Sequence, residues 1–378
     1  MRPTSPRTSN RIRAAVLGCT GLVGQQFVRM LAGHPHFETV ALTASDGSAG
    51  KPYGRAAAWS SGGEVPASSA GSEVLGTSVD SVVESGAEVV FSALPAAAAD
   101  RLEPELRRRG LFVFSNASSR RLDPDVPIVI PEVNAPHLAL AERQALTHGG
   151  AIVTNSNCST AGLVMVLAPL LRLGLESVTV MTYQAVSGAG RRGVAAMDIS
   201  ANVIPFIRNE EAKMARETRK ILGTLAPEGV RDLEIEVNAA CCRVPVREGH
   251  LLGLRLDFGT EVGPAAVKDA LARFRSLPQD LALPTAPERP IIVREEEDRP
   301  QPVLDAWAGR PERARGMAVS VGRVRGSGRS INGFALVHNT VRGAAGTCVL
   351  TAELALSQGL LRPQLKDGQA PYSPLDVW

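Results

Sequence analysis

The sequence lacks the features that mark membrane, secreted and nucleic-acid-binding proteins. No apolar run approaches the roughly 18 to 20 residues that a membrane-spanning helix needs. Residues 1–10 contain no apolar segment of the kind found in secretory signal peptides. No basic stripe is interleaved with aromatic residues, and aromatics make up only 4% of the chain. We therefore expect a cytoplasmic protein that binds neither membranes nor nucleic acids.

Cysteine is scarce, and its pattern argues against disulfide and metal frameworks. The chain has five cysteines, an odd number, and they form no Cys-x-x-Cys pair. They also show no metal-ligand spacing with the six histidines. We therefore expect free thiols in a reducing compartment and no bound metal ion. The cysteines are Cys19, Cys158, Cys241, Cys242 and Cys348.

The composition that remains is that of an ordinary globular enzyme. Of 378 residues, 44% are hydrophobic and 21% are charged, and the formal net charge is +3. A chain of this length is expected to fold as two domains.

The first part of the chain alternates short strands with helices. An apolar strand ending at Leu17 leads through a glycine turn into a helix. Further strands are predicted within 38–45, 87–95, 111–118, 126–134 and 151–158, and a helix over 96–110. This alternation is typical of βαβ units around a parallel sheet. Residues 1–156 are therefore expected to form a Rossmann-type dinucleotide-binding domain.

The pattern changes after residue 156. Longer strands rich in β-branched residues are predicted within 177–188, 234–246, 250–258, 317–326 and 331–339, with helices over 210–225 and 263–277. Few helices separate these strands, so residues 157–338 are expected to form an α+β domain with a mixed sheet. The charged, proline-rich segment 285–302 is expected to be an exposed arm. A C-terminal helix within 339–378 is expected to complete the first domain.

Three glycines lie between the first strand and the first helix. Gly18, Gly21 and Gly24 have the spacing G-x-x-G-x-x-G. Glycines in such a turn let backbone N–H groups approach a pyrophosphate at the helix N-terminus. A tight turn without a ligand could show the same spacing, but the strand–turn–helix context favours a dinucleotide.

The end of the second strand bears on the choice between NAD and NADP. An acidic residue at this point holds the ribose 2′-hydroxyl in NAD-dependent enzymes. Here the residues are small and hydroxylated, and Asp46 comes one position late. Ser45 and Ser48 could accept a 2′-phosphate, which favours NADP.

Cys158 directly precedes a long apolar segment that is predicted to be a buried helix. The polar residues before it are a helix N-cap signal, so the thiol should lie at the positive helix end, where thiolate is favoured. An unpaired cysteine is otherwise usually a small buried residue. Arg243 and His250, seven positions apart, offer a cation for an anionic substrate and a base for a thiol. A surface arginine and a turn histidine are the alternatives.

A charged pair lies in the predicted helix over 210–225. Glu210 and Lys213 are three positions apart and so share one helical face. Both could point into a cleft, but a solvated ion pair would have the same spacing.

These features lie in sequence blocks that resemble the aspartate-β-semialdehyde dehydrogenase family, in particular its archaeal and fungal branch. The blocks are GCTGLVGQ, TASDGSAGK, FSALP, SNASSRR, VPIVIPEVN, NSNCSTAGL, QAVSGAG, NVIPFIRNEEAKMARETRKILG, CCRVPVREGH and HNTVRGAAG. They cover nearly the whole chain in the expected order. The resemblance implies that the second domain serves catalysis and dimerisation in a cytoplasmic homodimer or homotetramer of amino-acid biosynthesis, on the route to lysine, threonine and methionine. The implied reaction is the reversible NADP-dependent reductive dephosphorylation of 4-aspartyl phosphate to aspartate 4-semialdehyde through a cysteine thioester.

The resemblance also implies a role for each matching residue. The catalytic set would be Cys158 as nucleophile, His250 as general acid/base, Gln184 orienting the acyl group, and Asn157 near the oxyanion. The substrate set would be Arg243 on the α-carboxylate, Glu210 on the amino group, Arg121 and Lys213 on the phosphate, and Ser119 as a further substrate-binding residue. The cofactor set would be Gly18, Thr20, Gly21, Leu22, Val23, Ser45, Ser48, Ser92, Ala93, Leu94, Ser187, Gly188, Asn339 and Thr340.

Four positions depart from the family pattern. Ser156 replaces a usual proline, and Glu248 replaces an aspartate. Gly47 replaces an arginine near the 2′-phosphate, which leaves NAD possible. Cys242 replaces an asparagine beside Arg243, so we expect a changed pocket shape.

Three other functions are therefore considered. Two are acyl reductases with the same chemistry, namely a malonyl-CoA reductase and an N-acetylglutamyl-phosphate reductase. Glu210 argues against both, because a carboxylate suits a free amino group in the substrate. The third is a catalytically silent scaffold, which would be expected to have lost the cysteine, the histidine or the phosphate-binding cations.

Overall fold

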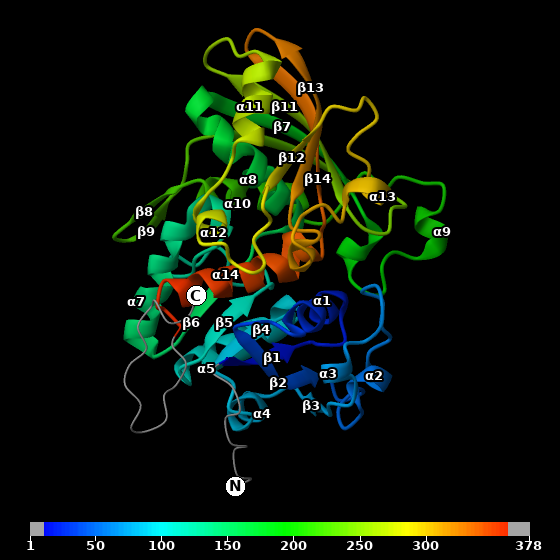
Figure 1. The fold of residues 1–378 in the computed structure, drawn as a ribbon, viewed down its shortest axis with the longest axis vertical. Coiled ribbons are helices and arrows are strands. Elements are labelled where there is room, and N and C mark those ends of the chain that lie inside the picture. The colour runs from blue at the N-terminus through cyan, green and yellow to red at the C-terminus, as the bar shows by residue number, and fades with distance from the viewer. Residues whose placement is uncertain (1–10, 362–378) are drawn as a thin grey trace. The chain divides into compact units, whose positions relative to one another are not determined.

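The structure is a computed structural model that describes residues 11–361 (Figure 1). Among these, 11–127, 136–155 and 348–361 form one unit, and 128–135 and 156–347 form a second. The predicted first domain includes 128–135, and the predicted C-terminal return begins at 339. The structure instead assigns 128–135 to the second unit and places the return after Thr347.

The first unit is built on a parallel sheet of six strands in the order β3-β2-β1-β4-β5-β6. The strands are β1 (Ile12–Leu17), β2 (Phe37–Ala44), β3 (Val74–Gly76), β4 (Val89–Ser92), β5 (Phe112–Ser115) and β6 (Ala151–Thr154). Every residue of β4 and β6 is buried, as expected for parallel strands covered on both faces. The strand order reverses between β1 and β4, and ligands of such sheets bind at the carboxyl ends of the strands at this point.

Helices cover both faces of this sheet because the chain winds in opposite directions from β1. Figure 1 shows α1 (Leu22–Leu31) and α14 (Gly346–Ser357) on one face, and α4 (Val79–Glu84) and α5 (Ala96–Arg108) on the other. The remaining helices are α2 (Tyr53–Ala56), α3 (Ala67–Ala70) and α7 (Ala139–His148). This arrangement confirms the predicted Rossmann-type fold.

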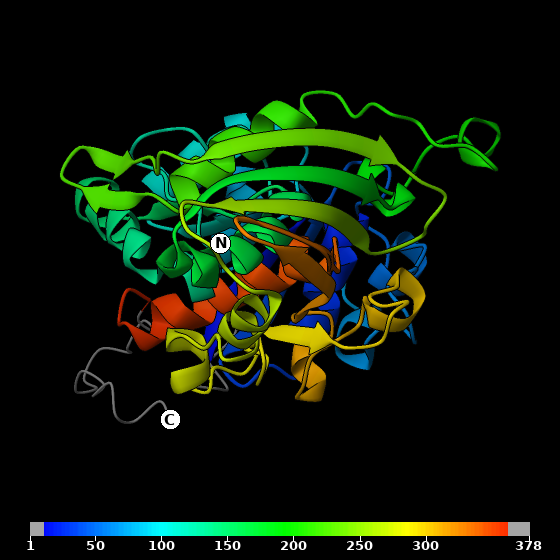
Figure 2. The same cartoon turned by 90° about the horizontal axis from the view of Figure 1, so that it is seen from above.

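The second unit contains a mixed sheet of six strands in the order β10-β7-β11-β14-β13-β12. The strands are β7 (Leu175–Gln184), β10 (Glu236–Arg243), β11 (His250–Phe258), β12 (Ile291–Arg294), β13 (Val319–Ser327) and β14 (Ser330–Val337). β8 (Thr224–Ala226) and β9 (Gly229–Arg231) form a separate hairpin. In Figure 2 the green to yellow-green strands β7, β10 and β11 lie side by side in one layer. The predicted mixed sheet is confirmed.

Helices pack on one face of this mixed sheet. α8 (Cys158–Leu170), α10 (Glu210–Ile221) and α11 (Pro264–Ala272) contact its strands. Short helices complete the unit: α6 (Pro131–Asn134), α9 (Ala196–Ile199), α12 (Leu277–Asp280) and α13 (Pro302–Asp305). Residues of β7, β10 and β11 alternate between this core and an outer face, on which Met181 is 44% exposed. Cys242 lies on the outer face while Arg243 is buried, so the expectation that Cys242 reshapes the pocket is wrong.

Two local predictions are wrong. The segment 126–134 contains no strand, because Pro131 begins helix α6 and the side chain of Asn134 bonds to the backbone of Ile128 and Ile130 at 2.8 Å. Those bonds replace a strand ladder. The supposed arm 285–302 contains β12, which pairs in parallel with β13. The apolar residues of β12 are few and are followed by a run of charged residues, so the sequence offers little sign of a strand.

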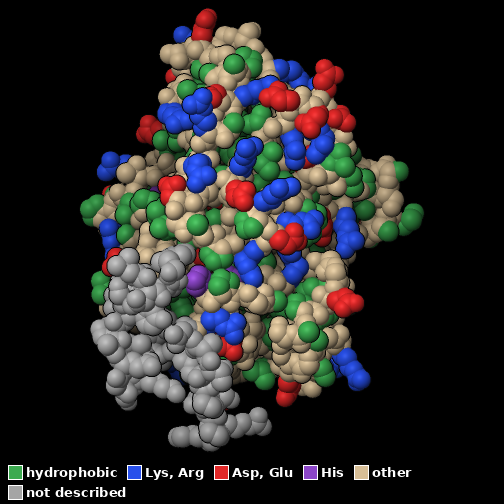
Figure 3. Space-filling view, viewed as in Figure 1, with side chains coloured by type: hydrophobic (Ala, Val, Ile, Leu, Met, Phe, Trp, Pro, Cys, Tyr) green, Lys and Arg blue, Asp and Glu red, His purple; other side chains and the backbone are tan. Residues whose placement is uncertain are grey.

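The surface of the molecule carries charges of both signs. On the face seen in Figure 3, basic and acidic side chains are interspersed, in keeping with the near-neutral net charge. Within residues 11–361, no helix combines the length and the apolar character needed to cross a bilayer.

Candidate active site

Four strand ends meet at one edge of the mixed sheet in the second unit. β7 and β10 run in parallel, and their last residues, Gln184 and Arg243, are paired in register. β11 runs the opposite way, so its first residue, His250, begins at the same edge beside the end of β7. β14 is antiparallel to β11 and ends at Val337, opposite His250. Residues from distant parts of the sequence are thus brought together by strand pairing alone.

Cys158 is the first residue of α8, as predicted. The helix is capped by Asn157, whose Oδ1 accepts hydrogen bonds from the N–H groups of Ser159 (2.9 Å) and Thr160 (3.1 Å). The apolar residues that follow are almost all buried, which fixes the helix against the sheet. The thiol therefore lies where the helix dipole favours a thiolate.

The remaining cysteines are poor candidates for a nucleophile. Cys19, Cys241 and Cys348 are buried. Burial raises the pKa of Cys19 to about 12 and that of Cys241 to about 11, and it also raises the pKa of Cys348. Thiols with such pKa values stay protonated at neutral pH and react slowly. Cys158 is half-buried on the core side of the sheet, and Cys242 is half-buried on the outer face.

A buried carboxylate joins two of the predicted catalytic residues. Glu210 is the first residue of α10, and its Oε1 accepts hydrogen bonds from Asn157 Nδ2 (2.8 Å) and Gln184 Nε2 (2.9 Å). The backbone N–H of Asn157 donates to the carboxylate of Glu217 at 2.5 Å. The amide of Asn157 is thus occupied by capping and by Glu210, so this residue positions Cys158. Its predicted place near the oxyanion stays a prediction.

The backbone of one residue, Ala185, contacts both the arginine and the histidine. The carbonyl oxygen of Ala185 accepts from Arg243 Nη1 at 2.8 Å, and its N–H donates to His250 Nδ1 at 3.1 Å. Arg243 is only 7% exposed, and burial lowers its pKa while the charges of Cys158 and Glu210 raise it. The guanidinium therefore lies within electrostatic reach of both the thiol and the carboxylate.

His250 is fully buried in a neutral form. Burial, and to a smaller extent the neighbouring Arg243 and His338, lower its pKa to about 3. Because Nδ1 accepts a hydrogen bond, the neutral ring carries its proton on Nε2. Nε2 has no hydrogen-bond partner among residues 11–361, and an added Cβ at Gly188 would lie 3.1 Å from it. The imidazole thus presents a donor toward the loop at 185–190.

Stability should depend on this buried histidine below neutral pH. The folded-state pKa of about 3 lies below the ordinary value of 6.5, so the unfolded chain binds an extra proton between these limits. The contribution is complete above pH 6.5 and is lost as the pH falls toward 3, by about 1.4 kcal/mol per pH unit. We expect His250→Asn to flatten the fall in the free energy of unfolding between pH 6.5 and 4.5, as measured with urea. Parallel curves for the variant and the native protein would contradict this expectation.

Asn339 ties together two loops at the sheet edge. Its Oδ1 accepts from the N–H of Gly249 at 2.9 Å, and its Nδ2 donates to Ser187 Oγ at 2.8 Å. Thr340, which was predicted to bind the cofactor, is buried beside His338. Gly188 is exposed and Ser187 half-buried, so this loop can reach a ligand. The nicotinamide contacts stay predictions.

The predicted phosphate-binding residues divide between the units. Lys213 is half-buried on α10, one turn after Glu210. Arg121 and Ser119 belong to the first unit, where Arg121 is 6% exposed and donates from Nη2 to the carbonyl of Asn116 at 3.0 Å. Their contacts with phosphate stay predictions.

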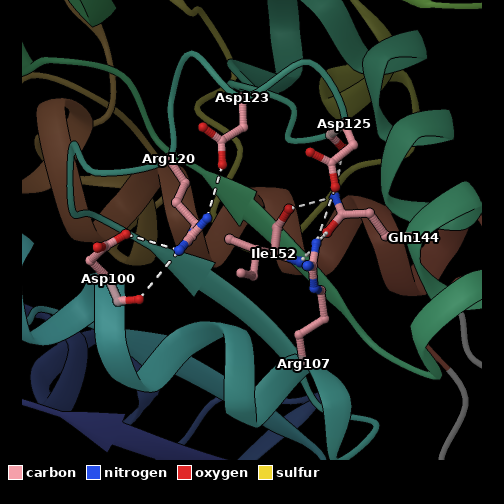
Figure 4. Close-up of polar contacts among 7 residues, drawn as sticks. All are labelled: Asp100, Arg107, Arg120, Asp123, Asp125, Gln144 and Ile152. Carbon is pink, nitrogen blue, oxygen red and sulfur yellow. Dashed lines mark hydrogen bonds and ion pairs between the residues drawn. The ribbon is translucent and has the colours of Figure 1, made fainter.

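Arg120, the neighbour of Arg121, has a structural role. It donates to Asp100 at 2.9 Å and to Asp123 at 3.1 Å (Figure 4). These bonds anchor the loop to α5. A second arginine, Arg107, ties the far end of the same loop to α7 through Asp125 and Gln144 (Figure 4). Two arginines thus fix the loop that carries Arg121.

The glycine loop of the first unit has the geometry of a pyrophosphate site. Gly18 has φ +70° and lies against the backbone of Ala93, so both predicted cofactor loops meet there. An added Cβ at Gly24 would lie 2.1 Å from the Gly18 oxygen, so the close packing of α1 on β1 requires glycine. No side chain caps the N-terminus of α1 at Gly21, which leaves its first N–H groups open to an anion. The loop residues Gly18, Thr20, Gly21, Leu22 and Val23 are all half-buried.

The other predicted cofactor residues differ in accessibility. Ser45 is exposed and Ser48 is half-buried after β2, where a ribose phosphate could approach. Leu94 is half-buried beside Ala93. Ser92 is fully buried beside Glu103, and its carbonyl accepts from Asn116 N–H at 2.9 Å, so its predicted contact with the cofactor stays a prediction. Alternation along β4 turns this hydroxyl into the core.

Comparison with known proteins places these features in one family. The family model described as semialdehyde dehydrogenase, NAD binding domain, matches residues 13–141, and the corresponding dimerisation domain matches 167–342. An aspartate-semialdehyde dehydrogenase of Archaeoglobus fulgidus is 46% identical over 93% of this chain and 100% of its own. The chain belongs to the aspartate-semialdehyde dehydrogenase family.

Two further relatives show the fold and the range of activities among similar proteins. The crystal structure of aspartate semialdehyde dehydrogenase with NADP from Candida albicans has a TM-score of 0.83 and 38% identity, and it covers 93% of this chain and 100% of that chain. A malonyl CoA reductase (NADP) of Metallosphaera sedula is 39% identical over 93% of this chain and 98% of its own. Fold, family and a nicotinamide cofactor are thus confirmed, and the chain carries the family's dimerisation domain.

Some residues that were not predicted from the sequence also hold the dehydrogenase site together. Glu217, on α10, receives the N–H of Asn157. Gln25 is buried on α1, donates to the Thr20 carbonyl at 3.0 Å and accepts from Ser60 N–H at 2.8 Å. Gln25 ends the first resemblance block, which was the only local signal for its role. Glu217 sits in a charged helix and offered none.

Proposed function

We propose that this chain catalyses the reversible NADP-dependent reductive dephosphorylation of 4-aspartyl phosphate to aspartate 4-semialdehyde. The observation that carries the proposal is the grouping of Cys158 with Arg243 and Glu210 in one unit. A guanidinium pairs with a carboxylate, and a carboxylate pairs with an ammonium group, so the two charges suit the two ends of a free α-amino acid. Malonyl and N-acetylated substrates lack the ammonium group that Glu210 would bind.

The covalent step follows from the position of Cys158. Its thiolate attacks the carbonyl carbon of the acyl phosphate, the carbon–oxygen bond to phosphate breaks, and phosphate leaves with the electron pair. A thioester to Cys158 remains. A bound NADPH would supply the hydride that reduces the thioester carbonyl. The carbon–sulfur bond would then break, with the electron pair returning to Cys158 as thiolate and the aldehyde released. Arg121 and Lys213 offset the charge of the departing phosphate.

His250 and Gln184 complete the arrangement. The Nε2 proton of His250 is the one available to the thiolate or to the tetrahedral oxyanion, so His250 enters the reaction as a donor. Gln184, held by Glu210, orients the acyl group. The fixed network means that little reorganisation is needed when charge develops.

NADP is the proposed cofactor, with NAD as a poorer substitute. Ser45 and Ser48 can donate to a 2′-phosphate, and no acidic side chain ends β2 to repel it. A Cβ added at Gly47 would meet nothing within 4 Å. The family pattern has an arginine at this position, so this chain has one cation fewer near the 2′-phosphate. We propose a homodimer or homotetramer formed through the dimerisation domain.

A substrate panel tests this proposal directly. The purified full-length chain is assayed with aspartate semialdehyde plus phosphate in the oxidative direction, and with malonyl-CoA and N-acetylglutamyl phosphate in the reductive direction, each with NADP(H) and NAD(H). We expect phosphate-dependent reduction of NADP by aspartate semialdehyde and no more than background rates with the other substrates. Faster turnover of malonyl-CoA would assign the chain to the reductases represented by the Metallosphaera protein.

Glu210→Gln should raise KM for the semialdehyde, because the ammonium group loses its charged partner.

A further inference from the structure

A buried ion pair lies beside the nucleophile helix and has no role in the proposed chemistry. Arg342 is fully buried, and its Nη2 donates to Glu132 Oε1 at 2.5 Å and contacts Met165 Sδ at 3.4 Å. Both side chains of the pair are completely inaccessible. Arg342 and Glu132 are separated by 210 positions, and the pair binds α6 to the segment after β14. This contact helps explain why residues 128–135 belong to the second unit.

Arg342 belongs to a π-helical turn that touches Cys158. The turn spans Val341–Ala345 and contains wide-spaced bonds from Gly343 N–H to the His338 carbonyl (2.9 Å) and from Ala345 N–H to the Thr340 carbonyl (3.2 Å). An added Cβ at Gly343 would lie 2.7 Å from Cys158 Cβ and 2.9 Å from its Cα. The backbone of the turn is therefore pressed against the nucleophile. Single π-helical turns of this kind are frequent at functional sites.

One face of α8 carries all of these contacts. Cys158, Gly162 and Met165 are spaced four and then three residues apart, so they share a face. Cys158 meets Gly343, Gly162 meets Val337, and Met165 meets Arg342. The arginine thus spans from the π turn to the second turn of α8, and it fixes the turn and the helix relative to each other.

Stability alone does not account for this ion pair. A single hydrogen bond joins the two side chains, while Arg342 Nε and Nη1 and Glu132 Oε2 have no hydrogen-bond partner among residues 11–361. Burying two charges with such incomplete satisfaction costs free energy, and apolar side chains of similar volume are often as stable or more so. The charged pair does fix the relative orientation of the two segments, because a guanidinium and a carboxylate pair in a defined geometry.

We infer that Arg342 and Glu132 are positioning residues that hold the π turn against Cys158 and so set the orientation and reactivity of its thiol. The pair touches neither substrate nor cofactor and acts through Gly343. The catalytic consequence rests on the proposed function, whereas the effect on the thiol does not. A misplacement of the nucleophile by about 1 Å lowers turnover by roughly 10²-fold.

The test compares thiol reactivity, turnover and stability in matched variants. Arg342→Met combined with Glu132→Leu removes both charges and leaves no buried charge unpaired, and Arg342→Lys keeps the charge but loses the planar fork. We expect the double variant to fold, to lose roughly 10- to 100-fold in kcat with little change in KM, and to show an altered pH midpoint for alkylation of Cys158 by iodoacetamide. Arg342→Lys should fall between this variant and the native protein.

A second ion pair in the same unit serves as the control. Arg299 donates from Nε to Asp305 at 2.7 Å, and Asp305 is buried. Arg299→Met should lower the unfolding midpoint and leave kcat and the alkylation profile unchanged. Native-like kcat and alkylation in both Arg342 variants would overturn the inference. If the native chain shows no dehydrogenase activity, the alkylation profiles still decide the inference, because they require no turnover. If the double variant does not fold, Arg342→Lys and Gly343→Ala carry the same comparison.

Discussion

Replacing Cys158 with serine or alanine is expected to lower kcat by roughly 10⁴-fold or more, because a hydroxyl or methyl group cannot form the thioester. The fold should be unaffected, since Cys158 is the first residue of α8 and the helix is capped by Asn157 rather than by the thiol. Binding of NADP should also persist, because the glycine loop lies in the other unit. The measurement is phosphate-dependent reduction of NADP by aspartate semialdehyde, alongside the unfolding midpoint and the Kd for NADP.

Cys242→Ser is the matched control for this loss. Cys242 is also half-buried, but its side chain lies on the outer face of the sheet, away from Arg243. We expect native turnover in this variant. Substantial activity in the Cys158 variants, or an equal loss in Cys242→Ser, would show that the acyl group is carried elsewhere.

The features that could be predicted from the sequence are those set by neighbouring residues. The turn at Gly18 and Gly24 and the helix start at Cys158 each depend on a few consecutive residues, and the structure contains both. The role of Cys158 could be proposed because its polar N-cap and the apolar run are adjacent in the chain. The same local reasoning identified β11 from His250 to Phe258.

The errors arose where a contact between distant residues decided the local structure. The apolar run at 128–130 looked like a strand, but Asn134 supplies its backbone partners and Pro131 begins a helix. β12 forms because β13 offers a partner edge, which the charged segment 285–302 does not reveal.

In the substrate site, too, the residue types could be predicted from the sequence, but their placement depends on contacts between distant residues. Arg243 and His250 could be singled out as a cation and a base, but their meeting with Gln184 depends on the register of β7 with β10 and β11. The link from Glu210 to Asn157 crosses 53 positions and has no local signature. Without the family resemblance, the spacing of Glu210 and Lys213 alone would have favoured a solvated ion pair.

Arg243→Leu is expected to raise KM for aspartate semialdehyde by roughly 10²-fold or more, since removing one partner of a buried charge pair costs about 2–5 kcal/mol. The loss should fall mainly on KM, because the carboxylate is bound in both the ground state and the transition state. Arg243→Lys keeps the charge but not the planar fork that reaches Ala185, so we expect an intermediate KM. Arg273 is the control: it is 77% exposed and pairs with Asp269 on α11, so Arg273→Leu should leave KM unchanged. An unchanged KM in Arg243→Leu would assign the carboxylate to another cation.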